Sequence, residues 1–254
     1  MEKTSMLFSI PKLIRLDITD STNKEAFRLL TVDELEEGSV ITASYQVSGR
    51  GHGESSWESE AGKNLLFSII LKPEFLPPSR QFRLNQAVAL GILEGISAIS
   101  GHDGFCIKWP NDIYFQKGKI SGMLIENSIM GEKFMYSVAG IGINLNQEVF
   151  LSNAPNPVSL SNITKKNFDV YDSLLRVVDK IMYWYQKLKS GQVREIEKAY
   201  HTNLLGYQSD LLFSDHAGVF TGKIMGVDKH GRLVINTLEG RKVSYELKQV
   251  RFVL

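Results

Sequence analysis

Residues 48–57, "SGRGHGESSW", place three glycines next to an arginine and a histidine and end on a tryptophan. A glycine-rich backbone can turn successive N–H groups toward an anion, and a guanidinium is a strong hydrogen-bond partner for phosphate. A short motif of this kind also occurs in mobile connectors whose arginine is merely solvated. The segment therefore indicates either a phosphate-binding loop or a connector.

A second feature is a predicted strand that carries glycines on one face. In "FMYSVAGIGINLN", residues 134–146, the period of two puts Gly140, Gly142 and Asn144 on the same side of the strand. Glycine weakens a strand and removes side chains from its face, so other atoms must fill that space. Either another backbone packs there or a ligand lies flat on the sheet, and the sequence leaves both alternatives open.

A third polar group lies in "KWPND". Pro110 ends a strand, and Asn111 with Asp112 is a favoured turn pair. Lys119, across the following hairpin, would join Lys108 and Asp112 at one end of the sheet. Taken alone, Lys108 and Asp112 would suggest a surface ion pair worth less than about 1 kcal/mol. Together with the loop and the strand glycines, they suit an anionic substrate with bound magnesium.

Strands and helices alternate through the first two hundred residues. "DSTNKEAFRLL" predicts a helix with Thr22 as N-cap and Glu25 completing a capping box. Apolar periodicity predicts further helices at 79–100 and about 170–189, and a shorter one ending near 204. Composition and alternation predict strands at 39–46, 64–72, 104–109, 119–127 and 134–146, with a long surface loop at 151–168.

After Gly206 the pattern changes to short strands separated by tight turns, "DKHG" and "LEG" among them. This spacing is typical of a small β-barrel. We therefore expect two domains, residues 1–205 and 206–254.

Composition excludes several classes of protein. A formal charge of +1 argues against non-specific nucleic-acid binding, and one cysteine excludes an internal disulfide framework. The apolar neighbours of that residue, Cys106, indicate a small buried side chain. No apolar run approaches the roughly 18 residues of a membrane span, and the N-terminus does not read as a signal peptide. We expect a cytoplasmic protein without a membrane partner.

Six motifs recur here in the order found in one family. They are "STN" at 21–23, "YQVSGRG" at 45–51 followed by Trp57, "GKNLLFS" at 62–68, "KWPNDIY" at 108–114, "KISGMLIE" at 119–126 and "GIGINLN" at 140–146. The ordered set resembles the biotin protein ligases, also called biotin–[acetyl-CoA-carboxylase] ligases. The resemblance implies an α+β fold, with a mixed sheet and helices like the catalytic core of class II aminoacyl-tRNA synthetases, followed by an SH3-like barrel.

The resemblance also implies an activity with biotin, ATP and Mg²⁺. Biotin would react with ATP to give biotinyl-5′-AMP, and a lysine of a biotin carboxyl carrier domain would then take the acyl group. Cations positioned around the phosphorus matter more in such a step than a general base.

Site residues follow from the same resemblance. The catalytic residues would be Lys119, Arg50 and Asp112, with Asp112 orienting or deprotonating the incoming lysine. Biotin would contact Ser21, Thr22, Asn23, Gln46, Gly49, Arg50, Gly51, Trp57, Lys119, Gly122 and Gly140. The nucleotide would contact Arg50, His52, Trp57, Lys108, Asn111, Lys119 and Asn144, and no side chain is assigned as a metal ligand.

The loop departs from the family pattern, which runs Gly-Arg-Gly-Arg-x-Gly-x-x-Trp or has Gln at the fourth place. His52 stands at that fourth place and Glu54 where the third glycine is expected, which bears on how tightly the adenylate is retained. We expect the loop to become ordered when biotin or the adenylate binds.

Partners and rival functions complete the expectations. About 20 residues precede "STN", too few for a three-helix DNA-binding domain, so we expect no DNA partner. Family members often self-associate through a sheet edge, and a homodimer is compatible with the sequence. The rival functions are a lipoate–protein ligase or octanoyltransferase of the same fold, and a non-catalytic biotin-binding adaptor. "KWPND" and the absence of an Arg-rich "GGG" loop argue against the lipoate enzymes.

Overall fold

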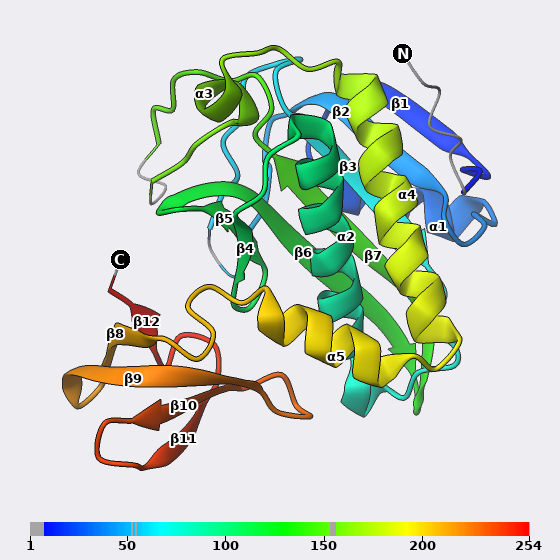
Figure 1. Cartoon of the computed structure of the whole chain (residues 1–254). Helices are drawn as coiled ribbons and strands as arrows, with labels where there is room; N and C mark the ends of the chain where they lie inside the picture. Colours follow the sequence, from blue (N-terminus) through cyan, green and yellow to red (C-terminus); the bar gives the residue numbers. More distant parts are fainter. Residues whose placement is uncertain (1–7, 52, 54, 153–155, 254) are drawn as a thin grey trace.

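The computed structural model describes residues 8–51, 53, 55–152 and 156–253. Within this part of the chain lie a seven-stranded mixed sheet with helices and a second, five-stranded antiparallel sheet (Figure 1). The predicted α+β class is confirmed. None of the described helices is both long and apolar enough to cross a membrane.

The large sheet has the strand order β1-β2-β3-β7-β6-β5-β4. Its neighbours are antiparallel except for the parallel pair β1 and β2. The sequence predicted five of these strands and missed β1, an edge strand with no fully buried residue, and β5, which has only four residues. The strands are β1 (Leu13–Thr19), β2 (Val40–Gln46), β3 (Leu65–Leu71), β4 (Phe105–Lys108), β5 (Asp112–Phe115), β6 (Gly118–Met130) and β7 (Lys133–Ile143).

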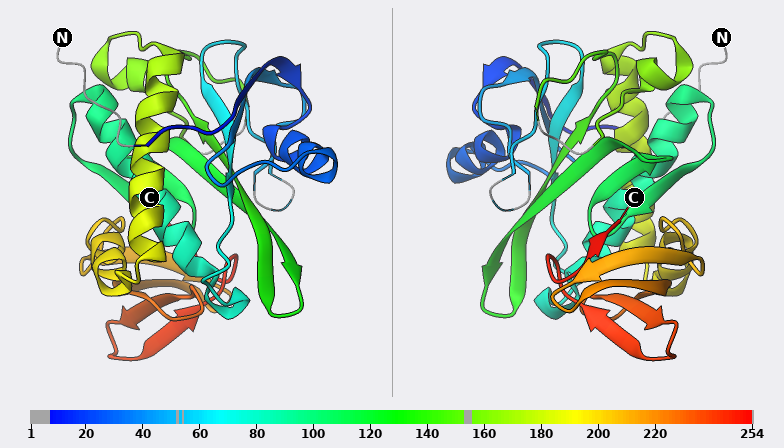
Figure 2. Two further views of the ribbon diagram at one scale, coloured as in Figure 1. Left: turned by 90° about the vertical axis from the view of Figure 1, so that its right-hand side faces the viewer. Right: turned by 90° about the vertical axis from the view of Figure 1, so that its left-hand side faces the viewer.

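Two long helices cover one face of this sheet, α2 (Phe82–Ser100) and α4 (Val170–Lys189) (Figure 2). They pack closely because Gly91 of α2 has no side chain, and a Cβ there would lie 2.4 Å from the Cα of Ile181. The short helices α3 (Leu160–Thr164) and α5 (Val193–Thr202) and a 3₁₀ turn (Pro78–Arg80) complete this part of the fold. The predicted 151–168 loop thus contains one turn of helix.

Helix α1 (Thr22–Val32) lies on the opposite face (Figure 2). Ala26 anchors it against Ile41, Ile70 and Val138 of the sheet. The predicted capping box at its start is wrong, because Ser21 is the N-cap and its side chain makes no capping hydrogen bond. Thr22 is the first helical residue, and its hydroxyl contacts a serine of β3 instead. The polar groups at this helix start are directed toward the sheet.

The second sheet has the order β11-β10-β9-β8-β12. The chain changes from helix to this sheet between Thr202 and Asp210, and the predicted division at residue 205 lies in that interval. The indole N–H of Trp109 donates to the carbonyl of Gly231 across the two sheets, at 2.8 Å. The strands are β8 (Asp210–Asp215), β9 (Gly218–Val227), β10 (Leu233–Thr237), β11 (Lys242–Tyr245) and β12 (Arg251–Phe252).

A histidine of α5 makes the contact between this helix and the second sheet depend on pH. Nε2 of His201 accepts a hydrogen bond from the backbone N–H of Val227 in β9, at 3.0 Å. Burial lowers the pKa of His201, which means that the folded chain favours the neutral ring. As the pH falls below about 6.5, the unfolded chain therefore binds more protons at His201 than the folded chain does. The contribution of neutral His201 to the stability of the fold is present above that pH and is lost below it.

We expect the urea midpoint of unfolding to be lower at pH 5.5 than at pH 8, and His201→Gln to flatten this dependence because glutamine does not titrate. Urea denaturation of both proteins at the two pH values measures it. Equal pH slopes for parent and variant would contradict the assignment.

Candidate active site

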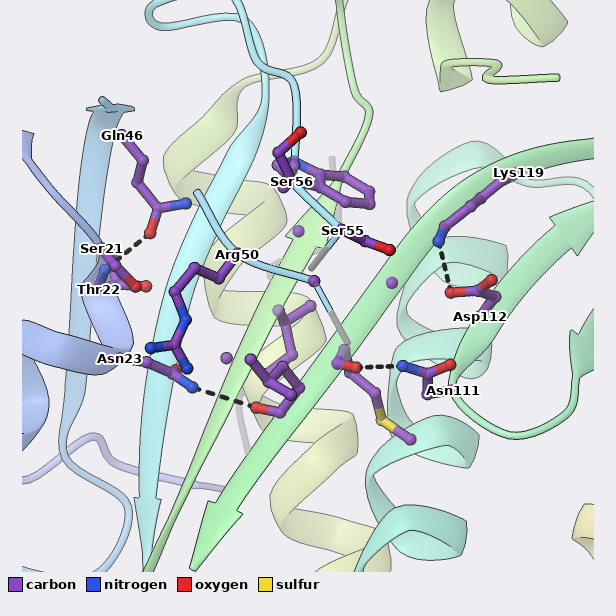
Figure 3. Close-up of a pocket in the computed structure, with 18 residues that line it drawn as sticks. Ser21, Thr22, Asn23, Gln46, Arg50, Ser55, Ser56, Asn111, Asp112 and Lys119 are labelled. Carbon is purple, nitrogen blue, oxygen red and sulfur yellow. Dashed lines mark hydrogen bonds and ion pairs between the residues drawn. The ribbon is translucent and has the colours of Figure 1, made fainter. Parts of the chain in front are cut away.

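A pocket of about 180 Å³ opens on the α1 side of the large sheet (Figure 3). The start of α1, the end of β2, the loop after β2 and the strands β5, β6 and β7 all contribute to its wall. The lining residues are Ser21, Thr22, Asn23, Gln46, Arg50, Gly51, Ser55, Ser56, Trp57, Asn111, Asp112, Lys119, Gly122, Met123, Leu124, Gly140, Ile141 and Gly142.

One end of the pocket is lined by buried uncharged polar groups. Oε1 of Gln46 accepts from the backbone N–H of Thr22, at 2.7 Å, so the Gln46 amide nitrogen is left as a donor (Figure 3). The Ser68 hydroxyl lies 2.7 Å from Oγ1 of Thr22 and 2.6 Å from Oδ1 of Asn23. Ser68, Thr22 and Asn23 are all at least 96% buried. Their polar atoms must therefore be satisfied by one another or by a bound molecule.

The other end carries a lysine and a carboxylate. Nζ of Lys119 lies 2.7 Å from Oδ1 of Asp112, and both side chains are mostly buried (Figure 3). The ammonium also lies 5.7 Å from the ring centre of Trp57. Beside them, Asn111 donates to the carbonyl of Met123, which fixes the turn before β5 to β6. The ion pair with Asp112 and the turn held by Asn111 together fix the Lys119 ammonium at the edge of the pocket.

The glycine-rich loop folds back as a small hairpin over the pocket. Arg50 and Ser56 form an antiparallel β-bridge through their backbones. The backbone N–H of Gly51 donates to the carbonyl of Ser55, and the backbone N–H of Trp57 donates to the carbonyl of Gly49. The Arg50 guanidinium binds the carboxylate of Glu126 in β6, with Nη2 and Oε1 2.5 Å apart. The loop thus brings its arginine into the site, where a carboxylate of the chain holds it.

Side chains occupy the space above the strand glycines. A Cβ on Gly140 would lie 2.2 Å from Oδ1 of Asn23, and one on Gly142 would lie 2.4 Å from the indole of Trp57. Gly122 of β6 also faces Trp57, and a Cβ on this glycine would lie 3.2 Å from the indole ring. The sequence left a second backbone or a ligand as the two alternatives. The structure shows a third, in which α1 and the loop insert their own side chains.

Three of the predicted residues that the structure describes lie outside the pocket lining. The carbonyl of Gly49 accepts a hydrogen bond from the backbone N–H of Trp57. Lys108 lies between the rings of Tyr114 and Phe252, each about 5 Å away, and burial lowers its pKa. Asn144 is buried and donates to Val158, while its Oδ1 has no partner within the described chain. His52 lies outside the described residues, as does Glu54.

The sequence analysis did not assign the lining residues Ser55, Ser56, Met123, Leu124 and Ile141, and it missed three further residues that hold the site together. Ser68 is the one polar residue of a buried strand, "LLFSIIL", and that contrast could have identified it. Glu126 follows Gly122 and Leu124 on the same face of β6, as the period of two indicates. Gly142 was noticed as a strand glycine but was given no role.

Burial raises the pKa of Cys106 to about 11, which agrees with a structural thiol and not with a nucleophile. Within the described part of the chain, no three His, Cys, Asp or Glu side chains gather to hold a metal ion.

Comparisons with known proteins place the chain in a family. The model of the biotin/lipoate A/B protein ligase family matches residues 16–144, about half of the chain. The bifunctional ligase/repressor BirA of Bacillus spizizenii is 29% identical over 238 residues, covering 92% of this chain and 72% of the relative. The biotin–[acetyl-CoA-carboxylase] ligase of Paracoccus denitrificans is 26% identical, covering 89% of this chain and 94% of the relative.

A solved structure agrees with these relatives. The biotin protein ligase of Aquifex aeolicus, in complex with biotin and ATP, superposes with a TM-score of 0.78 at 29% identity, covering 95% of this chain and 98% of the other. The agreement extends over both sheets. The chain therefore belongs to the biotin/lipoate A/B protein ligase family, as a ligase of the biotin protein ligase kind.

Proposed function

We propose that the chain attaches biotin to a lysine of a biotin carboxyl carrier domain, using ATP and passing through biotinyl-5′-AMP. The buried polar end of the pocket is the observation that carries the choice of biotin. The relatives named as biotin ligases and the structure that holds biotin and ATP support the same choice.

A cyclic urea satisfies the atoms at that end. The Gln46 amide nitrogen is a donor, since its oxygen is already bound to Thr22, and it can donate to the ureido carbonyl. Ser21 and Thr22 offer hydroxyl groups beside it. The apolar residues Met123, Leu124 and Ile141 can contact the hydrocarbon part of the ligand.

A lipoyl or octanoyl group would leave the same atoms unpaired. Neither group has an N–H or a ring carbonyl at the end remote from its carboxyl group. Leaving buried donors and acceptors without partners costs about 1–3 kcal/mol each. A site built to hydrogen-bond its substrate rejects an analogue that lacks those groups. The geometry therefore favours the biotin ligase over its lipoate rival.

The first half-reaction joins the biotin carboxylate to the α-phosphorus of ATP. A carboxylate oxygen attacks phosphorus and pyrophosphate leaves, while negative charge accumulates on the phosphate oxygens. Lys119 of β6 and Arg50 of the loop both line the pocket. Both would exchange their present carboxylate partners for the ligand's anions and stabilise the charge that develops.

Mg²⁺ would accompany the triphosphate. In sites of this type it is held mainly by substrate phosphates with one or two protein oxygens, and it neutralises phosphate charge when bound. The unpartnered Oδ1 of Asn144 is a suitable oxygen, and the fit does not require a cluster of carboxylates. Asn111, Trp57 and Lys108 would contribute to the nucleotide side, Lys108 from outside the pocket lining.

The second half-reaction transfers the acyl group to the carrier. The lysine amine attacks the acyl carbon and AMP leaves. At present Asp112 is bound to Lys119, with the carboxylate and the ammonium 2.7 Å apart. When Lys119 turns to the ligand, the Asp112 carboxylate becomes free to accept a hydrogen bond from the incoming lysine ammonium. This assigns Asp112 to orienting or deprotonating the acceptor lysine.

We expect the purified chain to catalyse ATP–pyrophosphate exchange with biotin and not with lipoate or octanoate. Exchange reports the reversible formation of the acyl-adenylate without any carrier. The measurement is incorporation of labelled pyrophosphate into ATP, followed by mass analysis of a carrier domain. Exchange that requires lipoate would overturn the proposal, and biotin binding without exchange would favour a binding protein.

We expect Lys119→Ala to lower the rate of biotinyl-AMP formation by about 10²–10³-fold, as removal of a donor to a developing negative charge does in other enzymes. Single-turnover quenched-flow assays with saturating biotin and ATP measure this rate. Lys133→Ala, at the exposed start of β7, is the control and should keep the parent rate. An unchanged rate in Lys119→Ala would remove this residue from the chemistry.

A further inference from the structure

We infer that Glu126 is a positioning residue that makes the Thr22 hydroxyl a hydrogen-bond acceptor in the pocket, and thereby selects a ligand with an N–H group. The inference rests on the proposed function, since biotin is its ligand. Glu126 is not among the residues that line the pocket, and it acts through a chain of buried side chains.

The chain of contacts begins at the Glu126 carboxylate. Oε2 lies 2.7 Å from Nδ2 of Asn23, and the same nitrogen lies 3.2 Å from the carbonyl oxygen of Leu124. Both partners accept hydrogen bonds only, so the Asn23 amide must point its nitrogen toward them. Its oxygen Oδ1 then faces Ser68, at 2.6 Å.

Counting protons fixes the direction of the remaining bonds. Ser68 has one hydroxyl proton and two close oxygen neighbours, Oδ1 of Asn23 and Oγ1 of Thr22. An amide oxygen can only accept, so the Ser68 proton goes to Asn23. The 2.7 Å contact between the two hydroxyls then requires Thr22 to donate to Ser68.

Because its proton is directed to Ser68, the Thr22 hydroxyl can only accept a hydrogen bond from a ligand. It lines the pocket, and the described residues give Oγ1 no partner besides Ser68. Gln46, its neighbour in the lining, offers the opposite polarity because its free atom is the amide nitrogen. A hydroxyl that accepts beside an amide that donates matches the N–H and C=O of a cyclic urea.

The carboxylate is the part of this network that cannot reverse. Arg50 holds its second oxygen, with Nη2 at 2.5 Å, and a guanidinium has donors only. In Glu126→Gln the amide oxygen would stay on Arg50, so the new NH₂ group would face Asn23, where another NH₂ group now lies. Turning Asn23 to relieve this conflict reverses every bond down to Thr22, whose proton would then point at the ligand's N–H.

A double-mutant cycle on the full chain tests the inference, with biotin affinity measured by isothermal titration calorimetry without ATP. We expect Glu126→Gln to weaken biotin binding by about tenfold or more, a loss of the size of one buried hydrogen bond. In the Thr22→Val background, where there is no hydroxyl to orient, the same change should weaken binding by less than about threefold, since network members show non-additive effects. Repeating the cycle in Arg50→Ala tests the part played by this arginine. The glutamine introduced by Glu126→Gln can then turn its amide oxygen toward Asn23, so the coupling between positions 126 and 22 should be largely lost.

Glu132→Gln, in the exposed turn between β6 and β7, is the matched control and should bind biotin as the parent does. If Glu126→Gln does not fold, Ser68→Ala breaks the same network and should show the same non-additivity with Thr22→Val. Equal losses in both backgrounds would overturn the role of Glu126 and leave the proposed function standing. A parent chain that neither binds biotin nor supports exchange would overturn both.

Discussion

The site depends on one steric constraint, the bare backbone of β6 and β7 where Gly122, Gly140 and Gly142 face the pocket. Because these positions lack side chains, Asn23 and Trp57 reach within contact distance of the sheet backbone. The start of α1 and the loop can therefore close on the same patch of sheet. A methyl group at Gly140 or Gly142 would have to displace the side chain now packed there, and both approaches would be lost.

Charge in the site is balanced within the chain. Arg50 is bound to Glu126 and Lys119 to Asp112, so each candidate cation has a carboxylate partner of its own. A ligand anion that engages these cations competes with those partners, which limits how tightly any simple anion can bind. A molecule that also satisfies the buried polar end gains from both regions. This combination favours a ligand with a polar ring at one end and an acid group at the other.

The sequence predicted the fold class, the longer elements and most of the pocket lining. Residues next to glycine or proline signals, such as Arg50, Asp112 and Gly140, were found because those signals mark loops and bare strand faces. Lys108 was assigned to the nucleotide by the family resemblance, and its position between two aromatic rings, one of them in β12, depends on contacts that the sequence around it does not contain. The capping box at Thr22 failed because a tertiary contact with Ser68 replaced a local one. Ser68 and Glu126 act through contacts distant in sequence, which local patterns do not contain.

The bond from Trp109 to the carbonyl of Gly231 has a wider structural meaning. Three residues beyond Trp109 the chain reaches Asp112, while Gly231 lies in the turn before β10. None of the described residues of the second sheet lines the pocket, yet this sheet is one of the supports that fix where the acid at the pocket rim is held. The C-terminal part of the chain thus helps to hold the strand end that carries Asp112 in position, although it contributes no described residue to the pocket lining.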